Sequence, residues 1–165
     1  MVTLKRILVA TDFGEASEVA LAYGRELART FGARLDVLHV AEDIYARVFA
    51  ADGYIAPYPE LQREIEEGAK KRVDALLSDE DRVLLGGKAA MRTSNTPALE
   101  IVSYAREANV DLIVMGTHGR GPMAHLLMGS VAERVVRTAP CPVLTVRHPQ
   151  HEFVVPDALV AVTKV

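Results

Sequence analysis

Short apolar runs alternate with longer segments of helical periodicity along almost the whole chain. The runs begin at Ile7, Leu35, Ala89, Leu112 and Val143, and turn residues lie between them and the helical segments. Runs that are apolar on both faces are typical of strands buried in a parallel sheet, and amphipathic segments between them are typical of crossover helices. The sequence therefore predicts an α/β fold: a five-stranded parallel sheet with helices on both faces.

Apolar runs and the turn residues beside them define the bounds of the expected strands. Four of them are predicted at 7–10, 35–40, 112–115 and 143–146. The third strand is expected to combine 83–85 with 89–93, with a bulge at Gly86-Gly87 between the two parts. Residues 41–58, which contain several aromatics, Gly53 and two prolines, are predicted to be an insertion with a helical turn near 44–49.

Helical spacing and end signals set the expected helices. The first is expected to bury a stripe and to end at Gly32, in a left-handed cap; the stripe is Val19, Ala20, Tyr23, Leu27 and Phe31. Pro59 opens the second helix, whose inner stripe is Leu61, Ile65, Ala69, Val73 and Leu76. The Thr96 side chain is expected to cap a third helix, with Pro97 in its first turn and Asn109 at its end. A fourth helix begins near Ser130 and is stopped by Pro140-Cys141-Pro142.

The stretch from Leu112 to Val131 carries the strongest functional signal. An apolar strand leads into a glycine-rich loop, and the loop ends at Gly129-Ser130, where a helical segment begins. Ser130 followed by Glu133 predicts a capping box. First-turn amides such as that of Val131 would remain unpaired at the positive end of the helix dipole, and the glycines would let a ligand lie against the backbone. This combination predicts an anion site, and phosphate is the usual anion.

The glycines of this stretch follow a fixed spacing. Gly116, Gly119, Gly129 and Ser130 match G-x2-G-x9-G-[ST], and with this signature the chain resembles the nucleotide-binding universal stress proteins over 7–146. The resemblance implies a Rossmann-like sheet of the adenine nucleotide alpha hydrolase-like type, with strand order 3-2-1-4-5. The first and fourth strands would then flank the switch point where open α/β sheets bind ligands.

The resemblance also implies roles for individual residues. Asp12 would lie near the ribose and phosphates, and Val40 would contact adenine. The residues expected to bind ATP or AMP are Thr11, Asp12, Phe13, Val40, Met115, Gly116, Gly119, Arg120, Gly129, Ser130 and Val131. From the residues alone, Asp12 could equally cap the first helix or accept turn amides, and Val40 is simply a core valine.

The machinery for fast phosphoryl transfer is hard to find. No G-x4-G-K-[ST] motif occurs, and the phosphate loop contains no lysine. His118 or Arg120 could touch a γ-phosphate, and Asp12 could help to hold Mg²⁺ through the phosphates. We therefore expect an ATP-binding, nucleotide-dependent regulator of the stress response. The alternative is a slow Mg²⁺-dependent ATPase or phosphotransferase that uses the same pocket. A flavodoxin-like redox carrier is a third possibility, but the sequence offers few aromatics to sandwich a flavin.

Composition and weaker motifs limit the kinds of binding partner and ligand that we expect for this protein. A net charge of −3 gives no excess of basic residues that would favour nucleic-acid binding. No apolar run approaches the ~20 residues of a membrane span. A single cysteine is consistent with the reducing cytoplasm, where disulfides are rare. The pattern Gly119-x-Gly121-x-x-Ala124 follows the wrong strand for a dinucleotide site and contains Pro122. His148 and His151 are interpreted as solvated side chains rather than metal ligands, and Cys141 as a packed residue.

The fifth strand is expected to form an apolar sheet edge through Val143, Leu144 and Val146. Such an edge invites pairing with another chain, and in the family this strand pairs across a two-fold axis. We therefore expect a homodimer through the fifth strand. The resemblance divides the chain into a universal stress protein domain at 1–148 and a C-terminal tail at 149–165, which would pack on its own or on the partner subunit.

Overall fold

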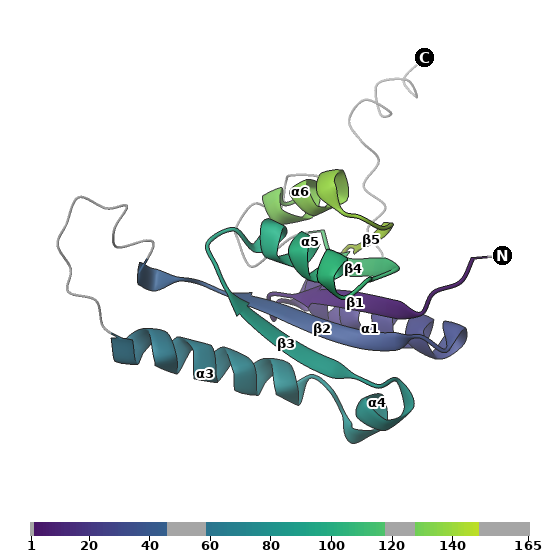
Figure 1. Ribbon diagram of the computed structural model, residues 1–165, viewed down its shortest axis with the longest axis horizontal. Helices are drawn as coiled ribbons and strands as arrows, with labels where there is room; N and C mark the ends of the chain where they lie inside the picture. The colour runs from purple at the N-terminus through teal and green to yellow at the C-terminus, as the bar shows by residue number, and fades with distance from the viewer. Residues whose placement is uncertain (1, 46–58, 118–127, 149–165) are drawn as a thin grey trace, which may run out of the picture.

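The computed structural model describes residues 2–45, 59–117 and 128–148. Within them five strands form one parallel sheet in the order β3-β2-β1-β4-β5 (Figure 1). The strands are β1 (Arg6–Thr11), β2 (Arg34–Ala41), β3 (Lys88–Thr93), β4 (Leu112–Gly116) and β5 (Val143–Val146). The α/β class, the parallel sheet and the expected strand order are confirmed. The order places β1 and β4 side by side at the point where the chain changes direction across the sheet.

Helices cover both faces of the sheet, as expected (Figure 1). One layer contains α1 (Glu15–Phe31) and α3 (Pro59–Ala75), with the short α4 (Asp79–Leu84) after α3. The other layer contains α5 (Pro97–Glu107) and α6 (Ser130–Thr138). None of the helices in the described ranges is long and apolar enough to cross a membrane.

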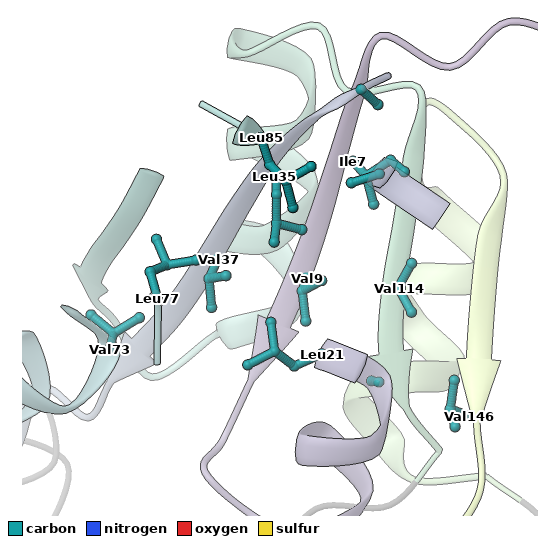
Figure 2. Close-up of a cluster of buried hydrophobic side chains, with 13 residues drawn as sticks. Ile7, Val9, Leu21, Leu35, Val37, Val73, Leu77, Leu85, Val114 and Val146 are labelled. Carbon is teal, nitrogen blue, oxygen red and sulfur yellow. The ribbon is translucent and has the colours of Figure 1, made fainter. Parts of the chain in front are cut away.

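The central strand explains why two cores form. Along β1, Ile7 and Val9 pack against the α1 layer, as Figure 2 shows, while Leu8 and Ala10 pack against the α5 layer. All four are at most 7% exposed. Side chains alternate between the faces of a strand, so a continuous apolar run is what a strand buried on both faces requires.

The buried face of α1 differs from the expected stripe. Tyr23 and Phe31 are 45% and 42% exposed, whereas the residues against the sheet include Ala20, Gly24 and Ala28. These three are spaced four apart and are small, so the helix backbone can approach β1 closely. The prediction of Tyr23 and Phe31 as core residues was wrong because large apolar residues of helical spacing do not reveal which face comes nearest to the sheet.

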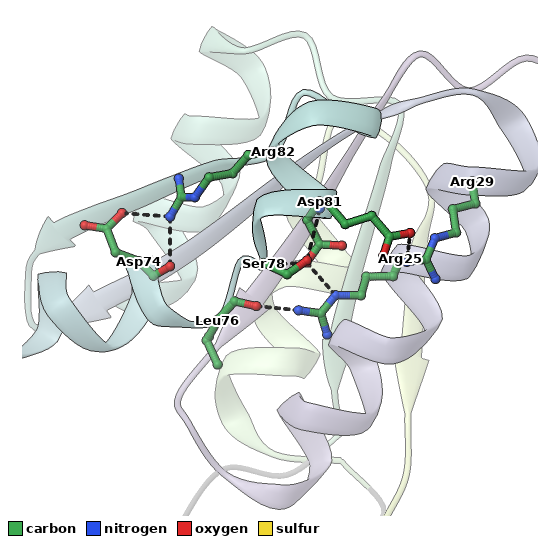
Figure 3. Close-up of polar contacts among 8 residues, drawn as sticks. Arg25, Arg29, Asp74, Leu76, Ser78, Asp81 and Arg82 are labelled. Carbon is green, nitrogen blue, oxygen red and sulfur yellow. Dashed lines mark hydrogen bonds and ion pairs between the residues drawn. The ribbon is translucent and has the colours of Figure 1, made fainter.

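Residues 83–85 are not part of a strand, as had been predicted, since α4 runs through Val83 and Leu84. A capping box starts that helix: the Ser78 hydroxyl accepts from the Asp81 amide at 3.1 Å, and the Asp81 carboxylate accepts from the Ser78 amide at 3.1 Å. Asp81 also accepts from Arg25 Nε of α1 at 2.9 Å, as Figure 3 shows. This local signal outweighs the strand propensity of three apolar residues, and β3 begins only at Lys88.

Several end signals are confirmed. Gly32 adopts the left-handed conformation after α1 (φ 63°), Pro59 opens α3, and Asn109 follows α5 with φ 51°. Two details differ from the prediction. The Thr96 side chain hydrogen-bonds Ser94 Oγ rather than capping α5. Leu61, placed in the inner stripe of α3, is exposed.

Candidate functional site

A cavity of about 420 Å³ lies at the carboxyl ends of β1, β2 and β4, between the N-terminal turns of α5 and α6. This is the switch point of the sheet, where ligand sites of open α/β folds occur. The lining includes eight residues expected from the sequence: Thr11, Asp12, Val40, Met115, Gly116, Gly129, Ser130 and Val131. Segments more than 100 residues apart in sequence therefore surround one space.

Three expected residues are not among the lining residues that the structure describes. Gly119 and Arg120, with His118 beside them, lie outside the described residues. Phe13 points to the other layer of the molecule, where its ring lies 4.2 Å from the His39 ring and 4.0 Å from the Arg72 guanidinium carbon. Phe13 is therefore not among the described lining residues, and its contact with a nucleotide stays a prediction. Its φ of 63° lies in the left-handed region.

The turn between β1 and α1 is fixed by its own side chains. Asp12 Oδ1 accepts from the Gly14 amide at 2.9 Å, and Thr11 Oγ1 accepts from the Phe13 amide at 3.0 Å. Ser17 Oγ donates to the Gly14 carbonyl at 2.8 Å, so Thr11 Oγ1 is the donor in its 3.0 Å contact with Ser17. Asp12 thus accepts a turn amide, one of the two roles open from the sequence, and it also lines the cavity.

The first turn of α6 lies at the cavity, and its amides meet no acceptor among the described residues. The N-cap is Gly129, which has no side chain to accept these bonds, and the Glu133 amide donates to the Gly129 carbonyl at 2.9 Å. The predicted Ser130–Glu133 capping box is therefore wrong, because the helix begins one residue earlier than that motif requires. In the part of the chain that the structure describes, no acceptor lies on the amides of Ser130, Val131 and Ala132. All three residues line the cavity, beside the positive end of the helix dipole.

Gly116 has a packing role. A Cβ built on it would lie 2.8 Å from the Ala16 Cβ and 3.1 Å from the Ala16 carbonyl carbon. The absence of a side chain therefore lets the first turn of α1 pack against the end of β4. This contact brings the start of α1 and the cavity floor together.

Further lining residues were missed from the sequence. They are Ala10, Ser17, Leu38, His39, Pro97, Ile101, Thr117 and Ala132. Two spacings could have indicated some of them. Leu38 shares a strand face with Val40, two residues on, and Ile101 lies one helical turn after Pro97. The remaining residues are brought in by tertiary packing alone.

His39 links two strands at the mouth of the site. Its Nδ1 lies 2.8 Å from the Thr11 carbonyl oxygen, which can only accept, so Nδ1 carries the proton. Across the described ranges, no group of three or more His, Cys, Asp or Glu side chains is arranged to hold a metal ion. Cys141 is half-buried, and burial raises the pKa of its thiol, so it behaves as a packed residue.

Comparison with known proteins fits this arrangement. The universal stress protein family model matches residues 3–147. The universal stress protein MJ0531 of Methanocaldococcus jannaschii is 34% identical over 148 residues, which cover 90% of this chain and 85% of that protein. The solved structure of MJ0577, from the same organism, has a TM-score of 0.71 at 30% identity, covering 88% of this chain and 97% of that one.

A universal stress protein solved in complex with cAMP shares the fold, with a TM-score of 0.54 at 22% identity over 88% of this chain and 98% of that one. Three observations point to the same family: the glycine signature, the strand order of the sheet and the match to the family model. The chain belongs to the universal stress protein family.

Proposed function

We propose that the cavity binds an adenine nucleotide, ATP in particular, and that the protein is a nucleotide-dependent regulator of the stress response. One observation carries this proposal: Ser130, Val131 and Ala132, whose amides meet no acceptor among the described residues, line the same cavity as Asp12 and an apolar wall. Anionic, polar and apolar parts of a nucleotide would each find a suitable partner there. The universal stress protein solved with cAMP binds a ligand of the same chemical class.

The apolar wall suits the base. Leu38 and Val40 reach the cavity from β2, Pro97 and Ile101 from α5, and Met115 from β4. A flat purine between such side chains would lose water from both faces, and each Å² of apolar surface buried is worth about 25 cal/mol. The cavity volume of about 420 Å³ falls in the range of small-molecule sites.

The polar end suits the ribose and phosphates. Asp12 can accept hydrogen bonds from ribose hydroxyls, and the α6 amides can donate to phosphate oxygens. A helix terminus alone is worth about 0.3–1 kcal/mol, whereas micromolar binding requires about 8 kcal/mol. Several charge-assisted hydrogen bonds of about 1.5–3 kcal/mol each, together with burial of the base, supply the difference. We therefore expect micromolar affinity.

Binding without efficient turnover is the stronger form of the proposal. Among the described residues that line the cavity, Asp12 and His39 are the only Asp, Glu, His, Lys or Arg side chains. The proton of His39 Nδ1 is engaged by the Thr11 carbonyl, and Asp12 Oδ1 by the Gly14 amide. Asp12 could still help to hold Mg²⁺ through bound phosphates, so slow hydrolysis is the alternative activity.

Native mass spectrometry and calorimetry of the purified protein test this proposal. We expect adenine nucleotide to co-purify or to bind with a stoichiometry of one per chain, without steady release of phosphate. Steady Mg²⁺-dependent phosphate release that Asp12→Ala abolishes, and that the matched variant Asp79→Ala at an exposed position of α4 leaves intact, would support the ATPase instead. Absence of adenine nucleotide binding by the folded wild type would refute both.

We also propose that the protein acts in the cytoplasm as a homodimer joined through β5. This strand pairs only with β4 among the described strands, so no described strand occupies its second edge. Val143, Leu144 and Thr145 are partly exposed along it, and an apolar edge strand pairs readily with a second copy. Residues 149–165, the proposed C-terminal tail, lie outside the described residues.

A further inference from the structure

The segment that follows β2 is held from two sides by side-chain amides. On one side lies Gln62 of α3, which is 6% exposed. Its Oε1 accepts from the Ile44 amide at 3.0 Å, and its Nε2 donates to the Glu42 carbonyl at 3.3 Å. On the other side lies Asn95, whose Oδ1 accepts from the Asp43 amide at 3.0 Å and whose Nδ2 donates to the Asp43 carbonyl at 2.8 Å. The segment therefore keeps a fixed position beyond the end of β2.

Asn95 continues the pairing of β2 with β3 beyond the last residues of the two strands. The strands pair in register up to Ala41 and Thr93, and the Ser94 amide then donates to the Ala41 carbonyl at 2.9 Å. At the next step a single side-chain amide, that of Asn95, engages both backbone groups of Asp43. Only the side chains of Asn and Gln combine an N–H donor with a carbonyl acceptor as a peptide group does. Replacement of Asn95 by Ala would therefore remove both bonds.

The Asn95–Asp43 contact joins two walls of the cavity. Val40, three residues before Asp43, lines the cavity from β2. Pro97, two residues after Asn95, lines it from α5. Only a short length of chain therefore separates the contact from the lining side chain on either side.

The start of α5 is not anchored by a helix cap. Pro97 has no amide hydrogen, and the Thr96 side chain accepts no bond from the helix. Further along the two walls, Leu38 of β2 and Ile101 of α5 belong to one buried cluster, so core packing fixes their separation. At the start of α5 the Asn95 contact serves in place of a cap and holds the helix to the end of β2.

We propose that Asn95 is a positioning residue for the nucleoside: its side-chain amide fixes the distance between the β2 and α5 walls that would enclose the base. Without this amide the walls would be free to separate, and a bound purine would lose contact with one of them. The amides of α6 take no part in the Asn95 contact, so ATP and adenosine should be affected alike. This inference rests on the proposed function, because it requires a nucleoside in the cavity.

Titration calorimetry with ATP and with adenosine tests the inference on the wild type, Asn95→Ala and Asn95→Gln. We expect Asn95→Ala to weaken the binding of both ligands about five- to tenfold, because two hydrogen bonds that hold one wall are lost. The ratio of the two affinities should stay the same. The melting temperature should fall by less than about 4 °C, since the side chain is exposed. Asn95→Gln keeps both the donor and the acceptor, and should retain affinities within about threefold of the wild type.

Thr96→Ala provides the matched control, because it removes an exposed hydroxyl of the same turn that contacts Ser94 rather than the segment after β2. It should leave both affinities unchanged. Hydrogen exchange reports on the contact itself: the Asp43 amide should exchange faster in Asn95→Ala than in the wild type or in Thr96→Ala. Wild-type affinities or an unchanged Asp43 exchange rate in Asn95→Ala would overturn the inference. A loss for ATP alone, or an equal loss in Thr96→Ala or Asn95→Gln, would also overturn it. In each of these cases ATP binding by the wild type would leave the proposed function standing, whereas failure of the wild type to bind either ligand would remove both.

Discussion

Gly24 of α1 lies so close to Val9 of β1 that a Cβ built on the glycine would be 2.3 Å from Val9 Cγ2. The contact fixes the spacing of α1 from the central strand. Gly24→Ala should therefore destabilise the protein by about 1–3 kcal/mol, because the helix must move away from a packed sheet. Chemical denaturation measures this change.

Gly68→Ala is the matched control for Gly24→Ala. Gly68 also lies within a helix, α3, but a Cβ built there meets nothing within 4 Å. The same substitution should therefore stabilise the protein by about 0.5–1 kcal/mol through higher helix propensity. Equal effects at the two positions would show that the close approach of α1 does not limit stability.

The Arg25–Asp81 contact should contribute more to stability than any exposed ion pair of this region. Asp81 is 1% exposed, accepts from Arg25 and caps α4 (Figure 3), so Asp81→Ala should cost about 2–4 kcal/mol. Glu80→Ala, next to it, removes a carboxylate that is 62% exposed and 3.3 Å from Arg29. That control should cost less than about 1 kcal/mol. Urea denaturation of both variants gives the comparison.

Asp81 should also make stability depend on acid. Burial raises the pKa of this carboxyl. The hydrogen bonds from the Ser78 amide and Arg25 lower the pKa, and together they outweigh burial, so the net pKa lies below the ordinary 3.8. The stabilisation is therefore present above the ordinary pKa and is lost as pH falls through the lowered folded-state value. Melting temperatures measured from pH 6 down to pH 2 should fall less steeply in Asp81→Asn than in the wild type. Parallel curves would contradict this role.

Gly129→Asp should abolish nucleotide binding without unfolding the protein. Aspartate is a favourable N-cap, so its carboxylate would accept from the first-turn amides of α6 and repel a phosphate from the same place. We expect an affinity loss of at least ~100-fold and an unchanged or slightly higher melting temperature, since a stabilised cap contributes about 1 kcal/mol.

Gly129→Asn distinguishes the effect of the added negative charge from the effect of a capping side chain that occupies the first-turn amides of α6. Asparagine caps helices about as well as aspartate but is neutral, so its effect on affinity should be clearly smaller. Calorimetry with ATP on both variants makes the comparison. A folded Gly129→Asp protein with wild-type affinity would mean that the α6 amides do not bind the phosphates.

The proposed dimer can be tested on the edge of β5. The carbonyls of Pro142 and Val146 accept from Ile113 and Thr117 on the β4 side, so the intervening Val143 and Thr145 direct their backbone groups outward. Thr145→Pro removes one outward amide without removing a bond to β4, and should shift the protein toward monomer. Thr145→Val retains the amide and should remain dimeric. Sedimentation analysis distinguishes the two, and a Thr145→Pro protein with undiminished dimer would contradict pairing through this edge.

Much of the architecture could be predicted because the strands are apolar on both faces. Val143–Val146 has the predicted bounds, and Gly32 and Pro59 mark the helix ends that their backbone preferences suggest. Val83 and Leu84 were misplaced because strand propensity was read without the cap at Ser78, although S-x-x-D was visible in the sequence. Propensity is a weak signal when a local hydrogen-bonding motif competes with it.

The parts of the candidate site that are formed by the backbone could be predicted from the sequence. The side chains that tertiary packing brings to the cavity were harder to predict. Glycine spacing indicated the start of α6, because unpaired amides and missing side chains are local features. The left-handed φ of Phe13 and the contact of its ring with His39 could not be predicted, because both depend on tertiary packing. Ile101 and His39 reach the cavity only because β1, β2 and α5 come together there.

The contacts of Phe13 with His39 and Arg72 have a consequence for the entropy of ligand binding. They anchor the chain next to Asp12, with ring and guanidinium distances of 4.2 and 4.0 Å. Ordering of this turn is therefore completed during folding rather than at the encounter with a ligand. Preorganisation of this kind leaves more of the interaction energy for affinity.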